Sequence, residues 1–164
     1  MCIFISSLLE LKNKFDVFAF DQWGVLHDGD RAYEGAIKCI EALSQTSSKI
    51  YIITNSGKRE NDNLDRISGM GFQSKWIDNI ISSGEIAWKA IASSNLPIKA
   101  NYPLNCYIIS RNEQDGFNWL KSNSGGIRVN KILNADLILL LGIPDDSKES
   151  DFNKILDESF SRNI

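Results

Sequence analysis

The sequence is poor in the side chains that build histidine- or cysteine-based sites. Its 164 residues include a single histidine, His27, which argues against a histidine-containing catalytic triad and against a histidine-rich metal site. The three cysteines, Cys2, Cys39 and Cys106, are odd in number and lack the spacing of metal ligands. They argue against a disulfide framework and a zinc site and are typical of the reducing cytoplasm, where we expect this chain to act.

Long apolar runs and long basic runs are also missing. No segment reaches the roughly 18 apolar residues of a membrane span, and residues 1–5 lack the cationic region of a signal peptide. The net charge of −3 and the scattered basic residues give no attraction for nucleic acid. One adjacent basic pair, Lys58-Arg59, follows a Ser-Gly turn. It could help to hold a phosphate, or it is a solvated pair in a first helical turn.

The sequence does contain a strand–helix–strand pattern. Residues 15–20 and 49–53 are short runs of β-branched and aromatic side chains, which predict buried strands. Residues 34–45 place apolar side chains on one helical face. Such a βαβ unit joins parallel strands, so both strands end at the same edge of the sheet. The hydrophobic content of 43% and the charged content of 24% are average for globular proteins.

Polar residues follow both strands at this edge. Asp21 ends the first strand, and Thr54 ends the second and is followed by Asn55, Ser56 and Gly57. A carboxylate nucleophile, a hydroxyl group and backbone N–H groups together can bind a phosphate. The alternative is that Asp21 only caps the turn after its strand.

Two motifs in these segments resemble a known family. Residues 21–29, Asp-Gln-Trp-Gly-Val-Leu-His-Asp-Gly, and residues 53–56, Ile-Thr-Asn-Ser, are similar to motifs I and II of the haloacid dehalogenase (HAD) superfamily. The form of motif I is closest to class IIA, the NagD and p-nitrophenyl phosphatase branch. Residues 81–85 resemble the start of the cap inserted in that branch. The resemblance implies an α/β fold: a Rossmann-like HAD core with a parallel sheet, and an inserted α/β cap domain.

The resemblance also implies a chemistry. Asp21 would attack phosphorus and form an aspartyl-phosphate that water hydrolyses. Thr54 would bind the transferred phosphoryl group, with Asn55, Ser56 and Gly57 close by. The carboxylate of Asp21 and the backbone C=O of Trp23 would hold Mg²⁺, and the substrate would be a small phosphorylated metabolite.

The sequence departs from the family pattern in two ways. Most phosphatases of the family carry an Asp as general acid two residues after the nucleophile, where this chain has Trp23. An indole cannot deliver that proton, and losing a general acid typically costs about 10²–10⁴-fold in rate. In members of the family, the lysine of motif III and the acids of motif IV come after the cap in the sequence. We therefore expect residues 1–81 to be the N-terminal half of the core and residues 82–164 an incomplete cap, with the C-terminal half of the core absent.

These departures leave two functions open. One is a Mg²⁺-dependent phosphomonoester hydrolase that is truncated and weak or inactive alone. The other is a non-catalytic phosphate-binding remnant, or a half-enzyme that needs a partner chain. A half-sheet exposes apolar surface, so a homo-oligomer or a complementing C-terminal fragment is the expected partner. In a rival alignment the apolar run 135–142 is the strand of motif IV, and a capless domain is complete. Its candidate acids and lysines are Asp145, Asp146, Asp151, Lys121 and Lys131.

The remaining side chains near Asp21 are expected to have structural roles. We expect His27 to be a solvated loop residue rather than a substrate contact, and Trp23 to pack rather than to stack on a leaving group. Asp28 and Gly29 are predicted to form a turn. Cys39, between two isoleucines of the predicted helix, is expected to fill the core.

Overall fold

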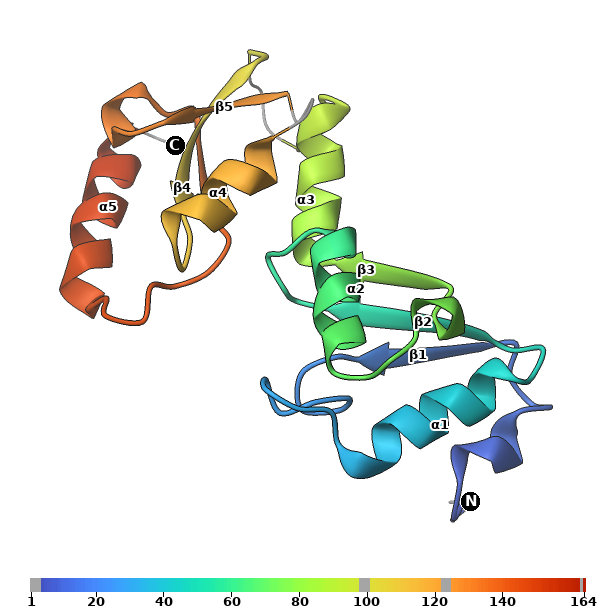
Figure 1. Ribbon diagram of the computed structural model, residues 1–164. Helices are drawn as coiled ribbons and strands as arrows, with labels where there is room; N and C mark the ends of the chain where they lie inside the picture. The colour runs from blue at the N-terminus through green and yellow to red at the C-terminus, as the bar shows by residue number, and fades with distance from the viewer. Residues whose placement is uncertain (1–3, 98–100, 122–124, 163) are drawn as a thin grey trace. The chain divides into compact units, whose positions relative to one another are not determined.

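The computed structural model describes residues 4–97, 101–121, 125–162 and 164, and it divides the chain into two compact units (Figure 1). The first unit consists of residues 1–56 and 60–83, and the second of residues 57–59 and 84–164. Each unit contains one three-stranded parallel sheet. The predicted α/β class with a Rossmann-like parallel sheet is confirmed.

The first unit is built on the predicted βαβ pattern, extended by one more strand. Its strands are β1 (Val17–Asp21), β2 (Lys49–Thr54) and β3 (Asn79–Ser82), in the order β1-β2-β3. The helices α1 (Glu34–Ser44) and α2 (Glu60–Gly69) connect them, and the short 3₁₀ helices η1 (Leu8–Leu11) and η2 (Ser74–Trp76) complete the unit. Sequence analysis missed β3 and assigned its last residues to the start of the cap.

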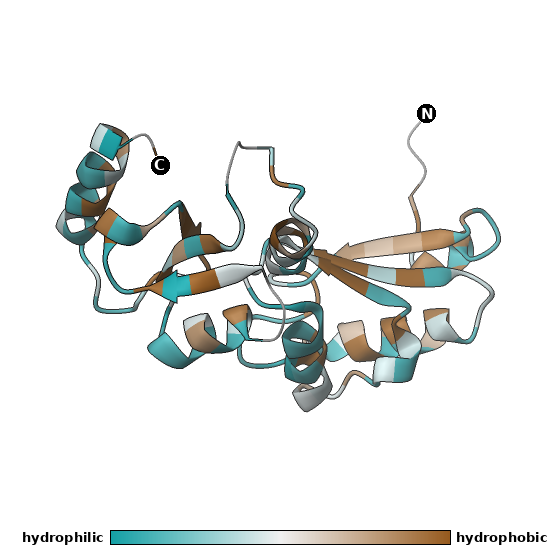
Figure 2. Ribbon diagram, turned by 90° about the horizontal axis from the view of Figure 1, so that it is seen from above, coloured by the Kyte–Doolittle hydropathy of each residue, from teal (hydrophilic) through white to brown (hydrophobic). Residues whose placement is uncertain are grey.

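Alternation along the strands divides the first sheet into two different faces. Ile50, Ile52 and Ile80 are buried on the face that carries the core with α1 and α2. Both helices lie on the same side of the sheet (Figure 2). On the other face, Val17 is 51% exposed and Ile53 is 50% exposed. Parallel sheets normally have both faces covered by other elements. In the described part of this unit, the face with Val17 and Ile53 is apolar and exposed, which is unusual for such a sheet.

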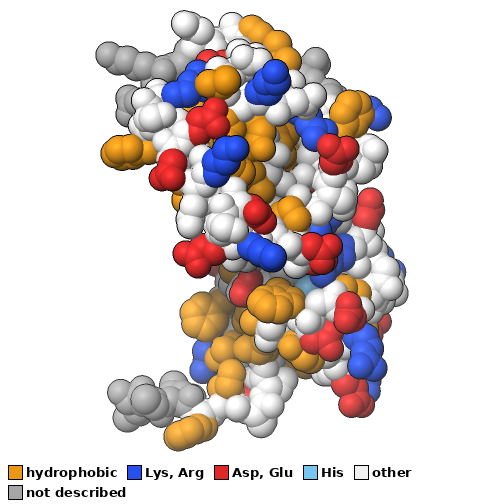
Figure 3. All heavy atoms as spheres, turned by 90° about the vertical axis from the view of Figure 1, so that its left-hand side faces the viewer, with side chains coloured by type: hydrophobic (Ala, Val, Ile, Leu, Met, Phe, Trp, Pro, Cys, Tyr) orange, Lys and Arg blue, Asp and Glu red, His pale blue; other side chains and the backbone are white. Residues whose placement is uncertain are grey.

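The second unit contains the sheet β5-β4-β6. Its strands are β4 (Leu104–Ile109), β5 (Gly126–Val129) and β6 (Leu137–Leu140), and its helices are α3 (Ser83–Ala92), α4 (Glu113–Leu120) and α5 (Glu149–Arg162), with η3 (Ile132–Asn134) before β6. Ile91, Leu104 and Trp119 are buried in its core. The space-filling view shows acidic and basic side chains intermixed, with exposed hydrophobic groups between them (Figure 3).

The pairing of β6 corrects the rival alignment of the sequence. The strand predicted at residues 135–142 pairs with β4 of the second sheet and not with a strand of the first sheet. A single capless sheet that joins β1 to a motif IV strand is therefore wrong. Asp145, Asp146 and Asp151 belong to the second unit, as do Lys121 and Lys131.

Two smaller expectations can also be compared with the structure. Cys39 is partly buried and packs against the first core, as predicted, and Cys106 is fully buried in the second core. Cys2 lies outside the described residues. Among the helices that the structure describes, none is long and apolar enough to span a membrane.

Candidate active site

Asp21 and Thr54 end two neighbouring parallel strands, as the βαβ pattern predicts. Asp21 is paired in register with Ile53, so Thr54 lies one residue beyond it on the adjacent strand. Both residues line a hollow of about 360 Å³ together with Asn55 and Ile53. The side chain of Asp21 is exposed, whereas Thr54 is only 7% exposed. Asp21 lies on the same face of the sheet as its register partner Ile53, which is 50% exposed.

The turn after β2 is shaped by the hydroxyl group of Thr54. The backbone N–H of Ser56 donates a hydrogen bond to Thr54 Oγ1 at 3.3 Å, a local contact that Thr side chains commonly make in turns. Asn55 is exposed and Ser56 is partly buried. Gly57 belongs to the second unit, so the four predicted phosphate residues continue from one unit into the other along the chain.

Ser82 is a further polar residue at this edge that sequence analysis missed as a site candidate. It ends β3, is paired in register with Thr54 and is fully buried. The signal was present in the sequence, because Ile80-Ile81-Ser82 repeats the Ile-Ile-Thr pattern that ends β2. It was overlooked because a strand of four residues is short compared with the helix that follows.

The loop that follows Asp21 is closely folded on itself. The N–H of Gly24 donates to the carbonyl of His27 at 2.8 Å, and the N–H of Leu26 donates to the carbonyl of Gln22 at 2.9 Å. Gly24 has a φ of +83°, a conformation that favours glycine. The backbone after Asp21 is therefore held in a defined conformation by local hydrogen bonds.

His27 is the buried centre of this loop and not the solvated residue that we expected. Its ring is 1% exposed, and Nδ1 accepts a hydrogen bond from the N–H of Gly29 at 3.0 Å. In a neutral ring the proton is then on Nε2, which lies 3.2 Å from Gln22 Nε2. The N–H of His27 Nε2 needs an acceptor. Because the oxygen and nitrogen of a side-chain amide are assigned from their hydrogen-bond partners, we assign the Gln22 oxygen to this contact. Burial, and then the positive charge of Arg66, lower the pKa of His27.

The turn at residues 28–31 agrees with the prediction for Asp28 and Gly29. Asp28 Oδ1 accepts hydrogen bonds from the N–H groups of Asp30 and Arg31, both at 2.9 Å. The bonds from Arg31 and Asp30 lower the pKa of the Asp28 carboxyl group. Gly29 has a φ of +116°, and its carbonyl accepts a hydrogen bond from Arg66 of α2 at 2.8 Å. Asp28 is thus a turn-forming residue.

Trp23, which we expected to pack rather than to stack on a leaving group, lies against the outside of its own loop. Its side chain is among the exposed large hydrophobic groups, at 68%, and Nε1 donates to the carbonyl of Asp28 at 3.0 Å. The indole therefore covers the outside of the loop. It occupies the sequence position two residues after Asp21, where a general acid would stand.

The comparisons with known proteins decide the family. The profile of the family described as haloacid dehalogenase-like hydrolase matches residues 18–112, more than half of the chain. The chain belongs to the haloacid dehalogenase-like hydrolases. This confirms the family expected from the two motifs. Comparison with curated proteins gave no match.

Solved structures of the HAD family share the fold of the chain. A haloacid dehalogenase-like hydrolase from Brucella suis has a TM-score of 0.81 and 20% identity, and the match covers 98% of this chain and 56% of that one. A possible sugar phosphatase of the HAD superfamily from Cytophaga hutchinsonii has a TM-score of 0.74 and 23% identity, with 99% and 57% covered. The glycerol phosphate phosphatase from Mycobacterium tuberculosis in complex with magnesium has a TM-score of 0.63 and 17% identity, with 90% and 42% covered. The chain spans about half the length of these HAD structures.

The side chain of Asp21, at the carboxyl end of β1, provides oxygen atoms of the type that Mg²⁺ prefers. Asp21 offers an exposed carboxylate. In the loop after it, the carbonyls of Gln22 and His27 already accept hydrogen bonds from the N–H groups of Leu26 and Gly24. Mg²⁺ in phosphate sites is commonly held by one or two carboxylates, with waters and phosphate oxygens completing its shell. No group of three or more His, Cys, Asp or Glu gathers within the described part of the chain. Among the residues that line the hollow, Asp21 carries the carboxylate.

The basic pair Lys58-Arg59 is more firmly held than a solvated pair would be. Arg59 Nε lies 2.6 Å from Glu85 Oε2, and the Arg59 side chain is 23% exposed. Lys58 Nζ lies 3.8 Å from Asp115 Oδ2. The interpretation of Arg59 as a solvated residue is therefore wrong, and its contacts are developed below.

Proposed function

We propose that this HAD-family chain catalyses the hydrolysis of a small phosphomonoester through an aspartyl-phosphate at Asp21, in a Mg²⁺-dependent reaction. The observation that carries the proposal is the exposed carboxylate of Asp21 beside Thr54, at the carboxyl ends of adjacent parallel strands and on a shared hollow. Ligands bind at this edge in open α/β sheets. Two relatives, one described as a glycerol phosphate phosphatase and the other as a possible sugar phosphatase, support a small phosphorylated metabolite as substrate.

In the proposed reaction, a carboxylate oxygen of Asp21 attacks phosphorus while the bond from phosphorus to the leaving oxygen breaks. Water then attacks the aspartyl-phosphate and releases inorganic phosphate, which returns Asp21 to its carboxylate form. The hydroxyl group of Thr54 and the N–H groups of Asn55, Ser56 and Gly57 would donate hydrogen bonds to the phosphoryl oxygens.

The carboxylate of Asp21 and the backbone C=O of Trp23 would hold the Mg²⁺ ion. A bound Mg²⁺ would offset the repulsion between the carboxylate and the phosphate. The relative from Mycobacterium tuberculosis, described in complex with magnesium, supports this choice of metal.

The nature of the leaving group follows from Trp23. Because an indole cannot protonate a leaving alkoxide, the chain should favour esters whose leaving group needs no proton, such as aryl phosphates. Substitution of Trp23 by Asp should restore a general acid at an exposed position, without opening a cavity in the core. We expect Trp23→Asp to raise hydrolysis of an alkyl phosphate far more than that of an aryl phosphate, with Trp23→Asn as the isosteric control.

The direct test is Mg²⁺-dependent hydrolysis of 4-nitrophenyl phosphate by the purified chain. Asp21→Asn should abolish turnover. Asp16→Asn, an exposed carboxylate just before the other end of β1, should leave it unchanged. Equal rates for the wild-type chain and Asp21→Asn would overturn the proposal.

A second candidate function is a half-enzyme that a partner chain completes. The specific observation in its favour is the uncovered sheet face with Val17 and Ile53, because Asp21 leaves the sheet on the same face. A chain that covered this face would also form a wall of the hollow. If the isolated chain is folded and inactive, the half-enzyme predicts that a complementing C-terminal fragment restores turnover, and that Ile53→Lys on the exposed face prevents this rescue. A folded, inactive monomer that still binds inorganic phosphate would instead favour a non-catalytic phosphate-binding remnant.

A further inference from the structure

Residues Gly57–Arg59, called the strap here, are a part of the second unit that the proposed reaction does not explain. They directly follow the turn at residues 54–56 but are assigned to the second unit, and the chain returns to the first unit at Glu60. The strap therefore continues the candidate phosphate loop of the first unit along the chain, but its residues pack against the second unit.

Backbone packing around the strap leaves no room for side chains at two glycines. A Cβ on Gly57 would lie 2.3 Å from the carbonyl oxygen of Leu141, and a Cβ on Gly84 would lie 2.0 Å from the carbonyl oxygen of Gly57. The second position is also 2.7 Å from the carbonyl oxygen of Lys58. The strap thus runs in direct backbone contact with the start of α3 and with the segment after β6.

Arg59 fastens the strap to α3 with two kinds of contact. Its Nε and Nη2 donate to Glu85 Oε2 and Oε1 at 2.6 Å and 3.3 Å. Its guanidinium carbon also lies 3.7 Å from the centre of the Trp88 ring, in a cation–π contact. The Glu85 side chain is only 8% exposed, and Lys89 Nζ lies 3.4 Å from its Oε1. Two-point carboxylate pairing combined with stacking is a contact that arginine makes and lysine cannot reproduce.

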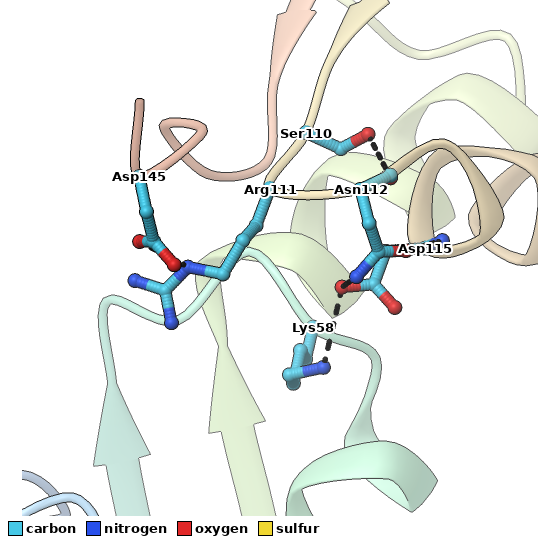
Figure 4. A network of polar contacts seen from close by, with 6 residues as sticks. All are labelled: Lys58, Ser110, Arg111, Asn112, Asp115 and Asp145. Carbon is cyan, nitrogen blue, oxygen red and sulfur yellow. Dashed lines mark hydrogen bonds and ion pairs between the residues drawn. The ribbon is translucent and has the colours of Figure 1, made fainter. Parts of the chain in front are cut away.

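Lys58 adds a weaker contact from the same strap to α4. Figure 4 shows it directed toward Asp115, and the two charges are 3.8 Å apart. Asp115 lies in the first turn of α4, where Asn112 caps the helix by accepting its N–H at 2.9 Å. The same figure draws the exposed pair of Arg111 and Asp145. Their charged groups lie 3.3 Å apart, and neither residue belongs to the strap.

We propose that Arg59 and Glu85 form a positioning pair that holds the strap and thereby fixes the Gly57 end of the phosphate loop. This inference rests on the proposed function for its effect on phosphate, but the holding of the strap can be tested without it. Neither residue touches the reacting atoms in this scheme. The pair acts by restricting the backbone of Gly57, whose N–H group is one of the donors proposed for the phosphoryl oxygens.

The first measurement is amide hydrogen exchange of residues 56–59 in the wild-type chain and in Arg59→Lys. The variant keeps the charge but loses the two-point pairing and the planar stacking, so exchange there should become faster by on the order of tenfold. The matched control is Arg111→Lys, which weakens an exposed pair of the same unit outside the strap and should leave these amides unchanged. Unchanged exchange in Arg59→Lys would overturn the positioning pair.

The second measurement is the affinity for inorganic phosphate in the presence of Mg²⁺, together with the urea midpoint. A positioning role predicts that Arg59→Lys weakens phosphate binding several-fold at a nearly unchanged midpoint. A shifted midpoint with unchanged phosphate affinity would indicate a purely structural ion pair and contradict the proposal. If the wild-type chain binds no phosphate, the proposed function fails, and the hydrogen-exchange result still decides whether the pair holds the strap.

Discussion

Substitution of Gly84 by alanine is the sharpest perturbation that the structure offers. The new Cβ would lie 2.0 Å from the carbonyl oxygen of Gly57, 2.4 Å from its carbonyl carbon and 2.7 Å from the carbonyl oxygen of Lys58. These are backbone atoms, so no side chain can rotate away, and either the strap or the start of α3 must move. Overpacking of this kind typically costs about 1–3 kcal/mol, and a rigid backbone contact favours the upper end.

The matched control is Gly35→Ala in α1. A Cβ at Gly35 meets nothing within 4 Å, and alanine favours helix more than glycine does. The free energy of unfolding should therefore stay constant or rise by up to about 1 kcal/mol in Gly35→Ala, whereas Gly84→Ala should lower it. Urea titration followed by circular dichroism measures both variants. Equal stability of Gly84→Ala and the wild-type chain would refute the close approach of the strap to α3.

Three further predictions concern the two cores and the loop after Asp21. Because the pKa of His27 is lowered from its ordinary value of 6.5, the unfolded chain binds a proton at higher pH than the folded chain; stability should therefore fall as the pH drops below 6.5, and His27→Asn should flatten this fall in urea titrations at several pH values. Ile50→Ala in the buried face of β2 should cost about 2–5 kcal/mol, whereas Ile53→Ala on the exposed face should cost less than about 1 kcal/mol, and the opposite order would contradict the assignment of faces. Burial, with nearby Asp136, raises the pKa of the Cys106 thiol to about 11, so its alkylation by iodoacetamide at neutral pH should be slow in the folded chain and fast in urea; rapid labelling of the folded chain would argue against a buried thiol.

The strand–helix–strand core and the position of Asp21 were predictable from the sequence because they depend on local patterns. Short runs of β-branched and aromatic residues predict β1 and β2, and the parallel connection requires their carboxyl ends to share one edge. The adjacency of Asp21 and Thr54 follows from that rule without knowledge of any side-chain contact. The turn at Asp28 was also predictable, because Asp and Gly form such turns through contacts within four residues.

The features that sequence analysis missed depend on side-chain contacts that apolar periodicity does not reveal. His27 is buried and makes hydrogen bonds with Gln22 and Gly29 within its own loop, a segment whose turn residues are typical of a solvated loop. Arg59 meets a partner 26 positions away in the chain, on a helix predicted only as a separate element. The strand β3 is short, so its alternation was too brief to be distinguished from the approach to a helix.

The most direct test of the central claim is a search for the covalent intermediate. The chain is mixed with Mg²⁺ and 4-nitrophenyl phosphate, quenched in acid and digested, and the peptide that contains Asp21 is examined by mass spectrometry. The account predicts a phosphoryl group on Asp21 that is absent from Asp21→Asn. Hydrolysis of the ester without a phosphoryl group on Asp21, or with equal turnover in Asp21→Asn, would contradict the assignment of Asp21 as the nucleophile.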